Sequence, residues 1–75
     1  MHNKTFETAV EKLKPTFSGV FNCILESGNQ LPFTEYDFGP AKTDSMSVSL
    51  FYKGKYYAYV DMRSVAAITV NFDED

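Results

Sequence analysis

The chain has 75 residues and carries ten acidic and seven basic side chains, which gives a formal net charge of −3. A chain of this length forms a single domain, residues 1–75, and buries only about 60% of its unfolded surface, so its core is thin. Seven Phe and five Tyr are more aromatic side chains than such a core can hold. Tyrosine tolerates an interface well, because its ring is apolar and its tip is polar. The composition therefore predicts self-association or binding to a partner protein.

Composition also excludes several classes of protein. Cys23 is the only cysteine and His2 the only histidine, so a disulfide within the chain is impossible and we expect neither a metal site nor a cofactor. No apolar run approaches the roughly 18 residues of a membrane span, so we expect no membrane association. A lone cysteine without an export signal predicts a cytoplasmic protein. The acidic balance, to which residues 73–75 contribute most, argues against non-specific nucleic-acid binding.

The first predicted element is a short amphipathic helix over residues 4–14. Its apolar side chains recur at helical spacing and line one face: Phe6, Ala9, Val10 and Leu13. Asn3 or Thr5 is expected to cap its start. Pro15 ends it, because the residue before a proline resists the helical conformation. A helix this short is unstable alone, so it must dock by its apolar face.

Two strands are predicted next, over residues 17–26 and 31–38, with a turn at Gly28 between them. The first is apolar on part of both faces, so we expect it to be a central strand or to lie beneath the helix. The second contains Pro32, which cannot donate a ladder hydrogen bond and therefore belongs at a strand start or a sheet edge. Residues 41–45 follow as a polar loop.

A β-hairpin is the best-defined element, and its strands are predicted over residues 46–52 and 55–62. A two-residue loop would place Leu50 opposite Tyr57 and mix the apolar face of one strand with the polar face of the other. A three-residue loop places Leu50 opposite Tyr56 and keeps one face apolar. It also puts Gly54 at the left-handed position that this loop requires. We therefore predict the three-residue loop.

The segment after the hairpin contains neither Gly nor Pro over residues 61–65, so a single 3₁₀ or helical turn is expected, with Asp61 as its cap. A last strand over residues 66–72 places its apolar side chains on one face: Ala66, Ile68, Val70 and Phe72. The predicted fold class is mostly β (α+β), with an N-terminal helix followed by a five-stranded antiparallel small barrel or rolled sheet.

This order of elements resembles the Sm-like family of small barrels, and SH3-like barrels more generally. The segment from Tyr57 to Ile68 looks like the fourth strand, 3₁₀ turn and fifth strand of the Sm-like family. The resemblance implies a ring-shaped oligomer that binds RNA. The family's RNA-binding motifs are largely absent, however. Asp37 matches the acidic residue of the first motif but no Asn follows it, and Tyr59 matches the Tyr of the second motif but Val60 and Asp61 follow it in place of basic residues.

No group of residues specifies a catalytic chemistry, and we predict no catalytic residues. Cys23 and His2 could form a nucleophile and a base, but Cys23 lies mid-strand among apolar neighbours, where cysteine acts as a small hydrophobe. Glu35 and Asp37 share one strand face, because they are two residues apart. Such a pair can transfer protons or bind a cation, but it more often forms the solvent face of an edge strand, which we favour. The acidic residues 73–75 are interpreted as a solubilising tail.

The candidate binding site is the outer face of the hairpin. Phe51, Tyr57 and Tyr59 line this face if the apolar parity faces the core, and Lys53 and Lys55 lie at the hairpin tip. An aromatic strip beside lysines can form a protein interface or stack bases, although the surrounding charge disfavours bases. Alternatively the N-terminal helix covers the strip, since that helix must dock somewhere. The sequence leaves the covered strip and the protein interface equally open.

We interpret the sequence as a non-enzymatic protein-interaction module that forms a homo-oligomer and binds an unidentified protein through the outer hairpin face. Its size, acidity and lack of chemistry suggest a regulator or inhibitor of a host complex, encoded by a phage or mobile element. The alternative hypothesis is an Sm-like oligomer that binds RNA or a nucleotide at its subunit junctions.

Overall fold

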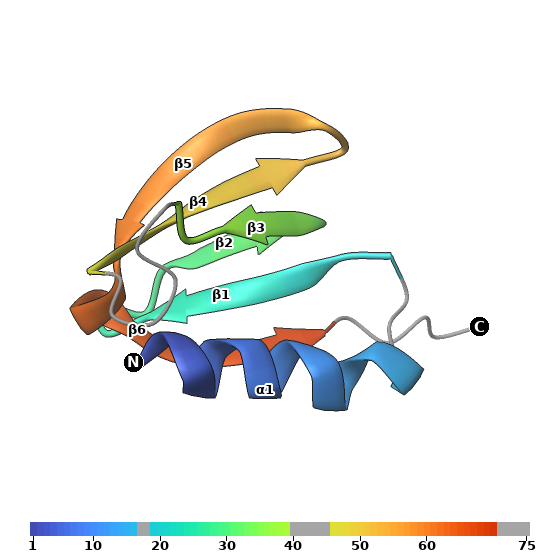
Figure 1. Ribbon diagram of the computed structural model, residues 1–75, viewed down its shortest axis with the longest axis horizontal. Helices are drawn as coiled ribbons and strands as arrows, with labels where there is room; N and C mark the ends of the chain where they lie inside the picture. The colour runs from blue at the N-terminus through green and yellow to red at the C-terminus, as the bar shows by residue number, and fades with distance from the viewer. Residues whose placement is uncertain (17–18, 40–45, 71–75) are drawn as a thin grey trace.

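The computed structural model describes residues 1–16, 19–39 and 46–70, and within them one N-terminal α-helix precedes two three-stranded antiparallel sheets (Figure 1). The prediction of a mostly β chain with an N-terminal helix is confirmed. The sheets do not form a closed barrel, and the described residues contain six strands rather than five. The predicted polar loop at 41–45 and the acidic tail at 73–75 lie outside the described residues.

The first sheet, called the β1 sheet, has the strand order β2-β1-β6. Its central strand β1 (Phe21–Leu25) confirms the prediction of a central strand, although it begins later than expected, after a bend at Gly19 with a φ of 111°. The predicted start of this strand at residues 17–18 lies outside the described residues. Pro32 belongs to the edge strand β2 (Gln30–Phe33), which confirms its predicted edge position.

The strand predicted over residues 31–38 is divided between the two sheets. β2 pairs with β1, whereas β3 (Glu35–Asp37) pairs with β4 in the second sheet. Thr34 lies between them and fastens this crossing point to the hairpin. Its N–H donates to the carbonyl oxygen of Phe51 at 2.8 Å, and its hydroxyl accepts from the N–H of Lys53 at 2.9 Å. The prediction of one continuous strand was wrong because hydropathy alternation carries no signal for a change of sheet.

The second sheet, called the β4 sheet, has the order β3-β4-β5 and contains the hairpin formed by β4 (Ser47–Tyr52) and β5 (Lys55–Asp61). The predicted three-residue loop was wrong. Tyr52 pairs with Lys55 across a two-residue turn, in which Lys53 and Gly54 have φ values of 51° and 82°. Two successive left-handed residues define the type I′ turn, whose twist matches that of the flanking strands.

A β-bulge corrects the face mismatch that this short turn would otherwise produce. Phe51 pairs with Tyr56, but Leu50 pairs with Ala58, so Tyr57 is an extra residue on β5. Beyond the bulge Val48 faces Val60. The predicted parity of the apolar face therefore survives beyond the bulge, although the predicted partners were wrong.

The connection between β5 and the last strand is the predicted short turn, a 3₁₀ turn over Met62–Ser64, and Asp61 caps it by accepting from the N–H of Arg63. Strand β6 (Val65–Val70) then pairs with β1. Ala66 was predicted to face the core and is exposed instead, whereas Val65 is buried. The pairing of β6 with β1 shifts register beside Val65, which explains the change of face. Phe72 lies outside the described residues.

Helix α1 (Asn3–Leu13) closes the core with Phe6, which is fully buried. The Phe6 ring packs against Phe33, Tyr36 and Phe38, with centroid distances of 5.8, 4.9 and 5.6 Å. The cap predicted at Asn3 or Thr5 is wrong: the Nδ1 atom of the preceding histidine accepts the N–H of Lys4 at 3.1 Å. A histidine ring nitrogen can accept this bond only while it is unprotonated.

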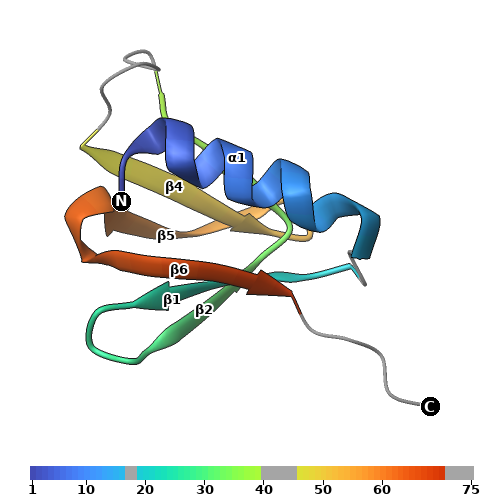
Figure 2. The same ribbon diagram turned by 90° about the horizontal axis from the view of Figure 1, so that it is seen from below.

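The remaining buried side chains come from both sheets and from the turn after β5, namely Val10, Phe21, Cys23, Phe33, Val48, Leu50, Val60, Met62, Val65 and Val70. Figures 1 and 2 place α1 and the β4–β5 hairpin on opposite sides of the molecule, with the β1 sheet between them. The inner faces of the two sheets and the apolar face of α1 therefore share one core. In the described part of the chain, no helix has the length and apolar character that crossing a membrane requires.

Candidate interaction surface

The outer face of the β4 sheet carries side chains that its three strands bring into register. Glu35 of β3 pairs with Phe51 of β4, which pairs in turn with Tyr56 of β5. In the next row of this face, Asp37 pairs with Ser49, which pairs with Tyr59. Paired residues of antiparallel strands lie on the same face. We call these six residues the outer face: Glu35, Asp37, Ser49, Phe51, Tyr56 and Tyr59.

The aromatic part of the outer face is open to solvent. Tyr59 is 69% exposed and Tyr56 is 56% exposed. The rings of Tyr56 and the half-buried Phe51 pack together with centroids 5.6 Å apart. The Ser47 hydroxyl donates a hydrogen bond to the Tyr59 hydroxyl, which holds that ring against β4. Helix α1 lies on the other side of the molecule (Figure 1), so the alternative in which the helix covers this strip is wrong.

Tyr57, which the sequence places beside Tyr59, has a different role. It is the extra residue of the bulge, and its hydroxyl donates to the carbonyl oxygen of Pro32 on the edge strand β2. Burial raises the pKa of its phenol, and the nearby Cys23 raises it further. The side chain thus links β5 to the β1 sheet and is not a member of the outer face.

The two lysines of the predicted site lie at the hairpin tip, apart from Phe51. Lys55 pairs with Tyr52, which has the opposite parity to Phe51. The Lys53 ammonium lies over the Tyr52 ring, 5.5 Å from its centroid. Both lysines are exposed. The structure therefore brings Phe51 and Tyr59 of the predicted site together, and leaves Tyr57, Lys53 and Lys55 outside the outer face.

Two groups of functional residues were missed from the sequence. Tyr56 was assigned to the core, because the bulge was not predicted. Glu35 and Asp37 were recognised as sharing a face, but the pairing of β3 with β4 was not predicted, so they were not connected with Phe51. A usable signal does exist: a two-residue turn at Gly54 requires one extra residue on β5 for the apolar parity to be kept.

The alternative chemistry at Cys23 is not supported by its surroundings. The side chain is fully buried in the core, and burial raises the pKa of its thiol from 9.0 to about 11. A thiol with such a pKa is almost entirely protonated at neutral pH and is a poor nucleophile. His2 is engaged as the helix cap. Among the described residues, no group of three or more His, Cys, Asp or Glu side chains is placed to hold a metal ion.

Asp61 and Arg63 form an ion pair at the end of β5. Arg63 donates to Asp61 through Nη2 at 2.8 Å and through Nε at 3.2 Å, in addition to the backbone cap. The hydrogen bonds from this guanidinium, and then the one from the backbone, lower the pKa of the carboxyl from 3.8 to about 2. The pair is exposed, so its attraction is screened by solvent and salt.

The lowered pKa of Asp61 predicts a specific pH dependence. A carboxyl whose pKa falls on folding stabilises the protein above its unfolded pKa, and this contribution is lost as the pH falls from about 4 to about 2. Asp61→Asn, which keeps a capping oxygen, should show a shallower decline of Tm than the wild type over this range. Thermal unfolding followed by circular dichroism measures it, with Glu26→Gln as the control. An unchanged decline in Asp61→Asn would contradict the assignment.

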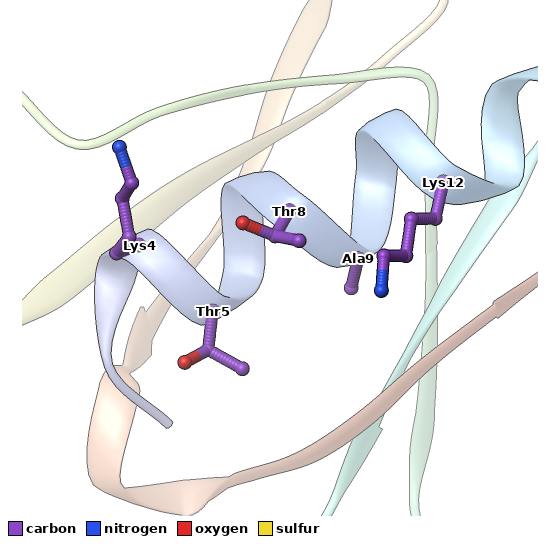
Figure 3. Close-up of a pocket in the computed structure, with 5 residues that line it drawn as sticks. All are labelled: Lys4, Thr5, Thr8, Ala9 and Lys12. Carbon is purple, nitrogen blue, oxygen red and sulfur yellow. The ribbon is translucent and has the colours of Figure 1, made fainter.

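The largest hollow on the described surface, about 340 Å³, lies along the exposed side of α1 and is lined by Lys4, Thr5, Thr8, Ala9 and Lys12. Figure 3 shows the two lysine side chains pointing away from one another. All five described lining residues come from one helix, so groups from different elements do not converge there. This hollow does not have the character of a ligand site.

Comparisons of the chain with protein-family models, with curated proteins and with solved structures found no match. The functional argument therefore rests on the outer face itself.

Proposed function

We propose that this chain is a non-enzymatic interaction module that binds another protein through the outer face of the β4 sheet. One observation carries the proposal. Tyr56 and Tyr59 are mostly exposed and flank Phe51, whereas the alternate residues of the same strands build the core. Tyrosine is enriched among the residues that dominate binding energy in protein interfaces. A small regulator or inhibitor of a larger complex, of phage or mobile-element origin, fits this arrangement.

The edge of the β4 sheet adds a second means of binding. β5 is the last strand in the order β3-β4-β5, and it is seven residues long. An edge strand presents unpaired N–H and C=O groups to which another strand can add. A second copy of the chain is one such partner, so the expected homo-oligomer belongs to this proposal.

The Sm-like hypothesis remains the alternative proposal. It is supported by the path of the chain, in which a helix precedes β1 and a 3₁₀ turn joins β5 to β6. The exposed Lys53 and Lys55 would supply positive charge to an RNA or a nucleotide. Glu35 and Asp37 oppose it, because they place negative charge beside the aromatic rings where bases would stack. The protein-binding proposal needs no such compensation.

Site-specific photo-crosslinking tests the proposal. A benzophenone amino acid replaces Tyr59 in one variant and Thr8, an exposed residue of α1, in the matched control. We expect a discrete adduct in cells from position 59 and none from position 8. An adduct of twice the 8.5 kDa chain mass indicates a homo-oligomer, and another mass indicates a different protein. Identical patterns from both positions, or no adduct from position 59, would contradict the proposal.

A further inference from the structure

We infer that the occupant of the outer face is a positively charged, extended protein segment, with Lys or Arg side chains opposite Glu35 and Asp37 and their stems against the aromatic rings. This inference rests on the proposed function and names the class of partner. It depends on the row-by-row pairing that places the two carboxylates beside the aromatic strip.

The charge of the outer face is the first argument. Glu35 and Asp37 are exposed, and neither has Lys or Arg as its register partner: Glu35 faces Phe51 and Asp37 faces Ser49. The one base at the far end of β5, Arg63, is bound to Asp61. The described outer face therefore presents two uncompensated negative charges. Charge complementarity favours a cationic partner and repels phosphate.

The aromatic strip is the second argument. A Lys or Arg side chain has an apolar stem that packs on a ring, and its charged head is attracted to the ring face. Phe51 and Tyr56 provide adjoining rings in the same row as Glu35. One basic side chain can thus contact a ring with its stem and reach a carboxylate with its head. An acidic peptide would gain only the apolar part of this contact.

The spacing of the carboxylates is the third argument. Glu35 and Asp37 are two residues apart on one strand, which separates them by about 6.6 Å along it. Alternate side chains of an extended segment have the same spacing. β3 is also an edge strand of its sheet, so an extended segment can approach beside it.

Fluorescence anisotropy with a labelled peptide of alternating Arg and Thr tests the inference. The full chain is expected to bind this peptide at low salt, and to bind a matched Gln–Thr peptide much more weakly. Glu35→Gln with Asp37→Asn should weaken binding about tenfold, because it removes both charges of the outer face. The matched control, Glu11→Gln with Glu26→Gln, makes the same change of net charge in α1 and in the β1–β2 turn. It should change the affinity less than about twofold.

Three results would overturn the inference. Equal weakening by both double variants would show attraction by net charge alone. Absence of Arg–Thr binding at low salt would remove the cationic partner, and tighter binding of a labelled oligonucleotide than of the peptide would assign the outer face to nucleic acid. If the peptide fails while position 59 still gives its photo-adduct, only the partner class is wrong. If both fail, the proposed function itself is wrong.

Discussion

Phe6→Ala is expected to lower the free energy of unfolding by about 3 to 5 kcal/mol, which is the usual cost of deleting a fully buried phenylalanine ring. Phe6 is 0% exposed and contacts rings from β2, from β3 and from the residue after β3. It is therefore the main attachment of α1 to both sheets. A domain of this size is stable by only about 5 to 15 kcal/mol, so the variant should be partly unfolded on mild warming. Urea unfolding followed by circular dichroism measures the loss.

Thr5→Ala is the matched control for this prediction. Thr5 is the neighbouring residue on the exposed side of α1, and its replacement should change stability by no more than about 0.5 kcal/mol. A cost below about 1 kcal/mol for Phe6→Ala would contradict the position of the helix, because it would mean that the ring does not fill the core.

Tyr56→Thr with Tyr59→Thr is expected to weaken binding of the Arg–Thr peptide about thirtyfold or more while the fold is kept. The expected loss, about 2 kcal/mol or more, is typical of removing a hot spot, and threonine preserves the strand propensity of β5. Stability should fall by less than about 1.5 kcal/mol, since both rings are mostly exposed and only the packing of Tyr56 on Phe51 is lost from the protein. Anisotropy and urea unfolding of the same sample separate the two effects.

Tyr57→Phe provides the control on the same strand. It removes the hydroxyl that donates to Pro32 and leaves the outer face intact. We expect a small loss of stability, about 1 kcal/mol, and no change in peptide affinity. The assignment of Tyr57 to the link between the sheets would be wrong if this variant weakened binding as much as the double tyrosine variant does.

Much of the fold follows from local patterns in the sequence. The spacing of Phe6 and Val10 predicts the helix and its buried face, and Asp61 predicts the cap of the turn before β6. These features depend on residues close together in the chain, so the sequence carries their signal directly. The edge position of Pro32 follows for the same reason, because a missing N–H is a property of that residue alone.

The errors arose where non-local pairing decides the structure. Thr34 changes sheets because its hydrogen bonds go to Phe51 and Lys53, which lie far from it in sequence. The left-handed Lys53, with a φ of 51°, allowed a two-residue turn that its side chain does not advertise. The bulge at Tyr57 then exchanged the predicted positions of Tyr56 and Tyr57. The candidate site was therefore located on the correct hairpin, but with one tyrosine misplaced and its acidic part missing.

Mapping of backbone amide shifts by NMR, as the Arg–Thr peptide is added to the labelled protein, tests the central claim most directly. The account predicts that the largest shifts belong to residues of the outer face: Glu35, Asp37, Ser49, Phe51, Tyr56 and Tyr59. The amides of Thr5 and Thr8 on α1 should not move, because the helix lies on the opposite side of the molecule (Figure 2). Shifts concentrated on α1, or spread evenly over both sides, would contradict the claim that the outer face of the β4 sheet is the binding surface.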